Sequence, residues 1–215
     1  MEGVPYRVFD DFLPDERRAE LYEYLMEPTW EWGWRSHRQT DQYRFWHKHF
    51  AGARRADRRN KDGTVRDRGQ DCAEELRGRA PLIWCFWEDV SGLLLKGHKL
   101  VRCYANGLQY GSDGTIHTDS VVPTSFTSVY YPHAVWEPNW GGETMFFDRA
   151  KRDVIGCSFP RPGRLVCFPG TVPHIARGVS RTCPLLRITL MFKTEGPGHV
   201  ASVNQNEEVA DGEDD

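Results

Sequence analysis

Two histidines and one aspartate have the types and the spacing of a metal site. His117 and Asp119 form the only His-x-Asp in the chain, within the segment 106–120. If residues 116–119 are extended, these two side chains point to the same face, because side chains alternate along a strand. His174 follows the turn PGTVP and begins another strand-like segment. Two histidines and one carboxylate leave coordination positions open, which suits non-haem Fe(II), whereas a structural metal would take four protein ligands.

An arginine further along the chain could bind an anion beside such a metal. Arg187 lies in the run LRITLMF, which otherwise has the composition of a core strand. A buried arginine is costly unless it meets an anion, and its guanidinium matches a carboxylate with two parallel hydrogen bonds. Thr189 shares the face of Arg187 and could add a hydroxyl donor. Arg181, in the turn SRTCP, is the alternative anchor, although solvent is the more natural partner of a turn residue.

The composition argues against several other classes of protein. The 215 residues suffice for one domain with a real core, and 39% apolar content with eight tryptophans indicates a globular protein. The formal net charge of −3 gives no basic field for nucleic acid, and no apolar run reaches the roughly 18 residues of a membrane span. Six scattered cysteines and an N-terminus without signal-peptide character predict reduced, mostly buried thiols and a cytoplasmic protein.

The elements that must position these residues change in character along the chain. The first 98 residues contain a short strand-like segment within 4–12 and two helical patterns, one at 15–26 and one from Pro81 to a cap at Gly97. From residue 99, short runs of β-branched and aromatic residues alternate with turn residues. We expect about eight strands, at 99–105, 115–120, 124–132, 142–148, 153–159, 164–170, 174–179 and 186–193.

This order of elements predicts a mainly β protein with flanking helices, in which a jelly-roll core is backed by the N-terminal helices. We expect one domain over 1–193, with a helical N-terminal part (1–98) and a jelly-roll core (99–193), followed by a disordered acidic tail (194–215). The charged segment 52–79 is expected to be a solvated loop, with an active-site lid as the less favoured alternative. His47 and His49 are a competing metal pair, but no carboxylate lies in register with them, so surface or packing roles are expected.

Five short motifs follow one another in the second half of the chain: HTD (117–119), WGGETMF (140–146), RPGRLVCF (161–168), PH (173–174) and RITL (187–190). In this order they resemble the Fe(II)/2-oxoglutarate-dependent dioxygenases, and in particular their prolyl 4-hydroxylase-like branch. The resemblance covers residues 100–193 and is specific for the superfamily, not for a substrate. The segment between His174 and the basic residue is a few residues longer than the usual pattern, which keeps Arg181 open beside Arg187.

The resemblance implies a double-stranded β-helix core of the cupin-like kind, with His117, Asp119 and His174 as iron ligands. It implies Fe(II), 2-oxoglutarate and O2 as cofactor and cosubstrates, with release of succinate and CO2 and oxidation of an unactivated C–H bond. A late basic residue would hold the distal carboxylate of 2-oxoglutarate. Tyr104 resembles the tyrosine that hydrogen-bonds this cosubstrate, with a core aromatic as an equal alternative. Asp119 favours hydroxylation, or desaturation or ring closure from the same radical, over halogenation, because related halogenases lack this carboxylate.

Substrate contacts are expected at the mouth of the barrel. Arg102 alternates with Tyr104 and is expected to face the interior, as is Tyr130. The loops would contribute four more residues, Gln109, Tyr110, Trp136 and Trp140. A small molecule, such as an amino acid or a biosynthetic intermediate, is the favoured substrate, and a peptide is the second. The remaining alternatives are a cupin-like zinc hydrolase or isomerase, which would not need a buried Arg187, and a non-catalytic binding module.

Overall fold

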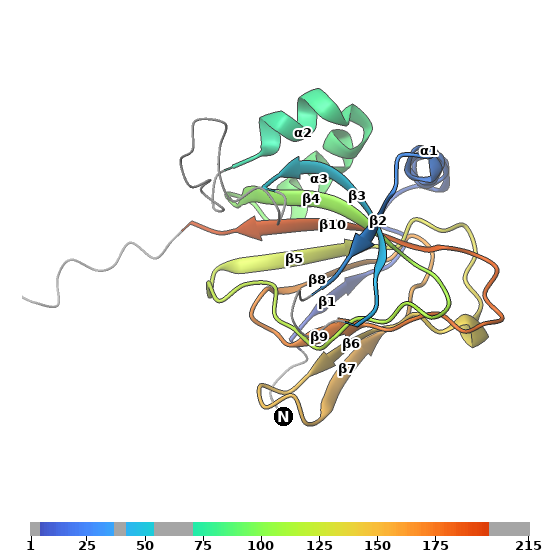
Figure 1. Cartoon of the computed structure of the whole chain (residues 1–215). Coiled ribbons are helices and arrows are strands. Elements are labelled where there is room, and N and C mark those ends of the chain that lie inside the picture. Colours follow the sequence, from blue (N-terminus) through green and yellow to red (C-terminus); the bar gives the residue numbers. More distant parts are fainter. Residues whose placement is uncertain (1–4, 37–41, 54–70, 198–215) are drawn as a thin grey trace, which may run out of the picture.

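Two antiparallel sheets face each other in the computed structural model, which describes residues 5–36, 42–53 and 71–197 (Figure 1). The larger sheet has the strand order β1 (Arg7–Phe9), β8 (Leu165–Pro169), β5 (Ser125–Tyr130), β10 (Arg187–Glu195), β4 (Lys99–Leu108), β3 (Phe45–Gly52) and β2 (Glu31–Trp34). The smaller sheet has the order β7 (Val154–Ser158), β6 (Thr144–Phe147) and β9 (His174–Ala176). This is the predicted jelly-roll architecture.

Helices pack on the outer side of the larger sheet, away from the smaller one (Figure 1). They are α1 (Asp15–Met26), α2 (Ala73–Arg79) and α3 (Pro81–Leu94). α3 begins with a proline, which is tolerated there because the first helical N–H has no partner within the helix. Its buried side chains recur every three or four residues, at Ile83, Phe86, Trp87 and Val90. The ring of Phe86 lies 4.6 Å from that of Tyr130 and 5.5 Å from that of Phe192, so this layer forms the main apolar core.

β10 lies in the middle of the larger sheet and divides the core from the space between the sheets. Ile188, Leu190 and Phe192 belong to the core beneath the helices. Because side chains alternate along a strand, the residues between them face the other way. We call these the inner row of β10; they are Arg187, Thr189, Met191, Lys193 and Glu195.

The neighbouring strand β4 is held against this inner row in a fixed register. Its Leu108, Asn106, Tyr104 and Arg102 lie opposite Arg187, Thr189, Met191 and Lys193, respectively. The register shifts after Lys193, which leaves Val101 as an extra residue in β4. Two strands therefore present paired rows of mostly polar side chains to the interior.

The two predicted helices are confirmed: α1 spans the predicted 15–26, and α3 begins at Pro81. Three corrections concern the strands. The N-terminal part contains more strand than predicted: the segment within 4–12 forms the predicted strand, β1, but β2 and β3 also add to the larger sheet. The predicted strand at 115–120 is wrong, because that segment contains only an isolated bridge between His117 and His174. The predicted tail begins too early, since β10 continues to Glu195; residues 198–215 lie outside the described ranges.

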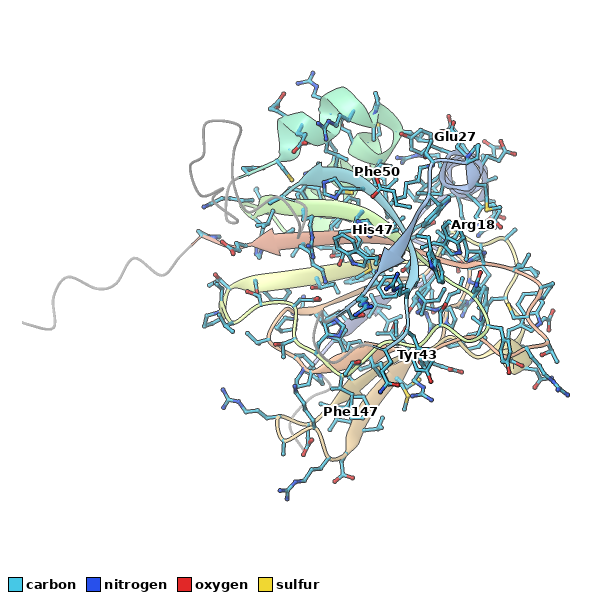
Figure 2. The ribbon with its side chains drawn as sticks, in the orientation of Figure 1. Arg18, Glu27, Tyr43, His47, Phe50 and Phe147 are labelled. Carbon is cyan, nitrogen blue, oxygen red and sulfur yellow. The ribbon has the colours of Figure 1, made fainter. Side chains whose placement is uncertain are left out.

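The segment 45–52, for which no strand is predicted, forms β3 and packs on both faces. His47 is 1% exposed, and its ring stacks on Trp34 with centroids 3.8 Å apart. Its Nδ1 lies 3.1 Å from Asn106 Oδ1. Phe50, further along the strand, belongs to the core beneath the helices (Figure 2). His47 is therefore a packing residue of the interior.

The charged segment 52–79 is not one continuous loop. Its last part is helix α2, where Leu76 is fully buried in the main core and Arg79 pairs with Glu75 at 2.7 Å. Residues 54–70, and with them the alternative of a lid, lie outside the described ranges. All six cysteines are free, and three of them, Cys72, Cys103 and Cys167, are buried.

His133 is fully buried where the segment after β5 meets α1. Its ring centroid lies 5.2 Å from that of Tyr22 and 4.7 Å from that of Trp136. The backbone N–H of Ile188 donates to its Nε2 at 2.9 Å. Burial, followed by the positive charge of Arg187, lowers the pKa of His133 from 6.5 to about 3. The folded protein therefore holds a neutral imidazole at this position.

Acid is expected to destabilise the protein through His133. Because the pKa of His133 is lower in the folded protein, the unfolded chain takes up the proton first as the pH falls. The contribution of neutral His133 to the free energy of unfolding is therefore complete above pH 6.5 and is lost as the pH falls toward 3. The slope is about 1.4 kcal/mol per pH unit, or about 2 kcal/mol by pH 5. In His133→Gln the side-chain amide oxygen can still accept the hydrogen bond from the Ile188 N–H. Glutamine does not titrate, so the unfolded variant takes up no proton at this position. Denaturant unfolding at pH 7 and pH 5 should show the larger loss in the wild type; equal losses would contradict the prediction.

Candidate metal centre

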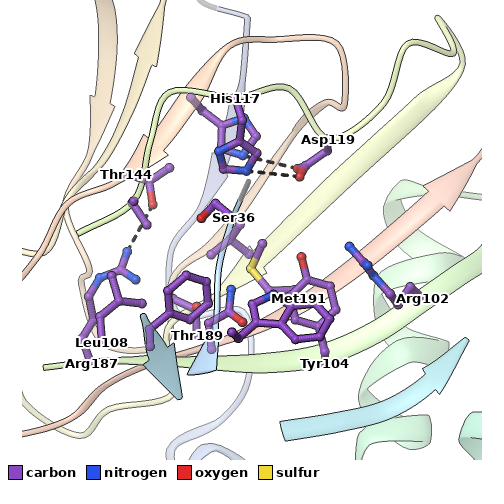
Figure 3. A pocket seen from close by; sticks show the side chains of 17 residues that line it. Ser36, Arg102, Tyr104, Leu108, His117, Asp119, Thr144, Arg187, Thr189 and Met191 are labelled. Atoms are coloured by element: carbon purple, nitrogen blue, oxygen red, sulfur yellow. Dashed lines mark hydrogen bonds and ion pairs between the residues drawn. The ribbon is translucent and has the colours of Figure 1, made fainter. Parts of the chain in front are cut away.

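His117, Asp119 and His174 meet between the two sheets. His174 is the first residue of β9, and His117 pairs with it through two backbone hydrogen bonds of 3.0 and 2.9 Å. The N–H of Asp119 donates to Gly170 O at 2.8 Å, which fixes the turn after the bridge. One ligand atom from each of the three side chains lies within 4.8 Å of the others (Figure 3). The bridge to His174, rather than a strand, brings His117 and Asp119 to the same side.

Both histidines present Nε2 to the centre. His117 Nδ1 lies 2.8 Å from Thr115 O, and His174 Nδ1 lies 2.9 Å from Val172 O. A carbonyl oxygen can only accept, so each Nδ1 carries the proton and each Nε2 keeps its lone pair. Burial lowers the pKa of His174 to about 4, against the opposing effect of Asp119. The centre therefore offers the neutral imidazole that a metal requires.

Asp119 is held by two donors through one of its oxygens. Thr127 Oγ1 donates to Oδ2 at 2.6 Å, and Lys193 Nζ donates to the same atom. Lys193 also donates to Thr127 Oγ1 at 3.1 Å. Burial alone would raise the pKa of Asp119, but Lys193 and the two histidines outweigh it and hold the pKa well below its usual value. The carboxylate is thus ionised, and its other oxygen, Oδ1, lies 3.6 Å from His117 Nε2.

Sequence reasoning missed Lys193 and Thr127. Lys193 closes the run LRITLMFK, where it continues the alternation of Arg187, Thr189 and Met191. Because every second residue of a strand points to the same face, this position indicates that Lys193 faces the interior. Thr127 carries no comparable signal, because small polar residues occur on both faces of β5.

Arg187 lies at the other end of the same pocket and is 1% exposed (Figure 3). Its Nε donates to Gly142 O, and its Nη2 donates to Thr144 Oγ1 at 3.2 Å. The guanidinium carbon lies 5.5 Å from the centre of the Tyr131 ring. Its Nη1 is buried and finds no hydrogen-bond partner among the residues that the structure describes. A buried cation with an unused donor is suited to a carboxylate.

A wider cavity, of about 450 Å³, adjoins this inner pocket at Asp119 and Arg102, which line both. Lys193 and Glu195 continue the inner row of β10 into it. Further lining comes from β5 and from the loop after His117, through Thr118, Ser120, Ser125 and Thr127. We call this the outer cavity. One hollow therefore follows the inner row from Arg187 to Glu195.

The structure separates the remaining sequence-predicted residues into two groups. Arg102, Tyr104 and Thr189 line the inner pocket. Five others line neither the pocket nor the outer cavity, namely Arg181, Gln109, Tyr110, Trp136 and Trp140. Arg181 is exposed on its turn. Gln109 accepts a hydrogen bond from Trp46, and Trp140, at the end of the short helix η1 (Pro138–Trp140), contacts Trp136.

Tyr130 faces away from the interior, contrary to the prediction. It is fully buried against Phe86 in the core beneath the helices, while its neighbours Val129 and Tyr131 belong to the cluster between the sheets. Most of β5 is buried on both faces, so its sequence has no polar face that would indicate which residues point inward.

Two histidines and one carboxylate with open coordination positions, held inside a jelly roll, are the ligand set that suits a non-haem Fe(II) oxygenase. Residues 101–192 match the model of the 2OG-Fe(II) oxygenase superfamily. This match covers less than half of the 215 residues but contains His117, Asp119 and His174, and over it the chain is similar to the 2-oxoglutarate-dependent dioxygenases, which use Fe(II), 2-oxoglutarate and O2.

Solved structures share the fold at low sequence identity. An oxidoreductase of the 2OG-Fe(II) oxygenase family from Burkholderia pseudomallei is 16% identical with a TM-score of 0.60, covering 89% of this chain and 85% of that one. A prolyl-4-hydroxylase from Pseudomonas putida is 18% identical with a TM-score of 0.57, covering 90% and 94%. HygX from Streptomyces hygroscopicus, with nickel and 2-oxoglutarate bound, is 8% identical with a TM-score of 0.53, covering 90% and 83%.

No curated protein matches the sequence at a significant level. Within the described ranges, no helix has the length and apolar character needed to cross a membrane.

Proposed function

We propose that His117, Asp119 and His174 hold the Fe(II), and that Arg187 binds the distal carboxylate of 2-oxoglutarate. The observation that carries this proposal is the free Nη1 of Arg187, a buried donor at the inner end of the pocket that also contains the three ligands. Thr189 and Tyr104 line the wall between the two ends and are positioned to contact the cosubstrate. Arg181, exposed on its turn, is not suited to this role.

Charge balance supports the same assignment. The two positive charges of Fe(II) and the one of Arg187 equal the three negative charges of Asp119 and a 2-oxoglutarate dianion. A buried site tolerates a balanced set of charges far better than an unbalanced one. Bound iron and 2-oxoglutarate supply the oxidising chemistry, with release of succinate and CO2. The chain contributes orientation, through the hydrogen bonds that fix both imidazoles, and a buried pocket with little water.

We propose that the reaction is hydroxylation of an unactivated C–H bond in a small molecule. The outer cavity supports this substrate class, because its volume of about 450 Å³ lies in the range of small-molecule sites. It also borders Asp119, so a substrate held there lies beside the metal centre. A peptide is the second candidate, favoured by the likeness in fold to the prolyl-4-hydroxylase from Pseudomonas putida.

The test is to add Fe(II) and 2-oxoglutarate to the purified protein without oxygen and to record the visible spectrum. Chelation of the iron by 2-oxoglutarate should produce a metal-to-ligand charge-transfer band, which His174→Ala removes. Succinate release after admission of oxygen then measures turnover. Iron that binds without giving the band would reject the cosubstrate assignment and bring the zinc hydrolase alternative forward.

Gly142 is expected to control the affinity for 2-oxoglutarate through Arg187. Its φ is +84°, and a Cβ at this position would lie 2.9 Å from Arg187 Cδ and 3.2 Å from Trp136 Cζ2. Gly142→Ala should displace the guanidinium and raise the Kd for 2-oxoglutarate about tenfold or more, as titration of the visible band would measure. Gly97→Ala is the matched control, because Gly97 also has a positive φ (+81°) but nothing within 4 Å of a Cβ. Equal effects of the two variants would contradict the steric explanation.

A further inference from the structure

We propose that the substrate carries a carboxylate group, and that Arg102 binds this carboxylate in the outer cavity beside the metal centre. The inference rests on the proposed function and specifies its substrate class. It makes Arg102 a specificity-determining residue, distinct from Arg187, the residue proposed to bind 2-oxoglutarate.

Arg102 lies where the inner pocket meets the outer cavity and lines both. Its guanidinium carbon lies 4.6 Å from the centre of the Tyr104 ring, so the side chain is stacked against the pocket wall. Its Nε is buried without a hydrogen-bond partner, and no carboxylate of the described residues forms an ion pair with it. Arg102 is therefore a partly buried cation with unused donors, and a planar guanidinium of this kind matches a carboxylate.

The charges in the hollow indicate that an anion is missing. Fe(II), 2-oxoglutarate, Asp119 and Arg187 balance one another, as described above. Lys193 and Arg102 then add two positive charges, and Glu195 is the single further acid among the lining residues of the described chain. One positive charge remains without a counterpart. One carboxylate on the substrate would remove this excess.

2-Oxoglutarate is not placed to supply that carboxylate to Arg102. Arg187 and Lys193 are six residues apart on β10, on the order of 20 Å along the strand. Arg102 lies opposite Lys193 in the sheet register, with Tyr104 and Met191 between it and the Arg187 end. Figure 3 shows the two arginines at opposite ends of the inner pocket. A cosubstrate held by Arg187 therefore leaves Arg102 directed to the outer cavity.

The walls of the outer cavity further restrict the substrate. Hydroxyl groups line it from the loop after His117 and from β5, at Thr118, Ser120, Ser125 and Thr127. Its volume of about 450 Å³ lies toward the small end of the range for ligand sites. A compact, polar carboxylic acid, such as a free amino acid or a hydroxy acid, fits these walls and this charge.

The experiment compares free acids with their uncharged amides. The probes are the free L-amino acids and small 2-hydroxy acids, each paired with its primary amide. Binding is measured by calorimetry on the full chain loaded with Zn(II) and 2-oxoglutarate, so that no turnover occurs. At least one acid should bind about 30-fold or more tightly than its amide, because the amide leaves a desolvated guanidinium without its charged partner.

Two variants separate Arg102 from the rest of the site. Arg102→Gln should weaken binding of that acid by a similar factor, leave the affinity for the amide unchanged, and retain the charge-transfer band with Fe(II) and 2-oxoglutarate. Arg181→Gln removes an exposed arginine that lines neither cavity and should change none of these values. Thermal melting of each variant verifies that it is folded.

Several outcomes would overturn the inference. The inference is wrong if acids and amides bind equally well, or if Arg102→Gln binds the acid as tightly as the wild type. It is also wrong if no compound of the panel binds to protein that forms the charge-transfer band. Loss of the band in Arg102→Gln would instead assign Arg102 to the carboxylate of 2-oxoglutarate, and would reject the substrate role. Absence of the band in the wild type is a separate failure, because it would reject the proposed function itself.

Discussion

Asp119→Asn should reduce succinate release by at least about a thousandfold, beyond the 10–100-fold cost typical of residues that only support a metal ligand. The amide has no negative charge with which to bind Fe(II), and it cannot balance the ammonium of Lys193, which donates to Asp119 in the wild type. The same preparation should retain little iron after desalting. Succinate release and iron content together measure the effect, and an active Asp119→Asn enzyme would reject Asp119 as a ligand.

A double variant separates loss of the ligand from loss of stability. Breaking a buried ion pair on one side costs roughly 3 kcal/mol, because the remaining charge is left without a partner. Asp119→Asn alone should therefore unfold at lower denaturant concentration than the wild type. Adding Lys193→Met removes the unpaired ammonium and should restore most of the stability, while iron binding stays lost. Recovery of activity in the double variant would contradict the assignment.

Arg187→Gln should raise the Kd for 2-oxoglutarate about a hundredfold or more, because truncation of one partner of a buried charge pair typically costs several kcal/mol. Glutamine lacks both the charge and the second donor nitrogen that two parallel hydrogen bonds to a carboxylate require. Iron binding should be retained, since Arg187 lies at the opposite end of the pocket from His117 and Asp119 (Figure 3). Titration of the charge-transfer band with 2-oxoglutarate measures both quantities.

Two further arginine variants test which residue is the anchor. Arg187→Lys keeps the charge but lacks the planar fork that contacts Gly142 O and Thr144 together, so an intermediate Kd is expected. Arg181→Gln should leave the Kd unchanged, because Arg181 is exposed on a turn. If Arg181→Gln weakens binding while Arg187→Gln does not, the anchor is Arg181.

The residues of the candidate metal centre could be selected from the sequence because their signals are local. His117 and Asp119 are two residues apart, and an arginine at position 187 is conspicuous in an otherwise apolar run. The jelly roll followed from the regular succession of short strands and turns. These features depend on residues that are close together in the sequence, so they can be recognised without knowledge of tertiary contacts.

Other features depend on pairing between distant segments, and the sequence did not reveal them. β3 forms because residues 45–52 pair with β4, about 55 positions later in the chain. The prediction that Tyr130 faces the interior is wrong because β5 is buried on both sides, which removes the polar–apolar alternation. The outer cavity likewise arises where β4, β5, β10 and the loop after His117 meet, and no single segment encodes it.

One face of β10 lies in the core and the other lines the pocket, and this limits which mutations the gene can carry. A point substitution in this strand alters one contact, on one face. A deletion or insertion of one codon exchanges the faces for every residue beyond it, so core residues such as Leu190 would turn toward the candidate metal centre and inner-row residues such as Lys193 toward the helices. β4 and β5 pair with β10 on either side and would not follow the shift. The strand can therefore accept changes of residue type at single positions, while its length is fixed.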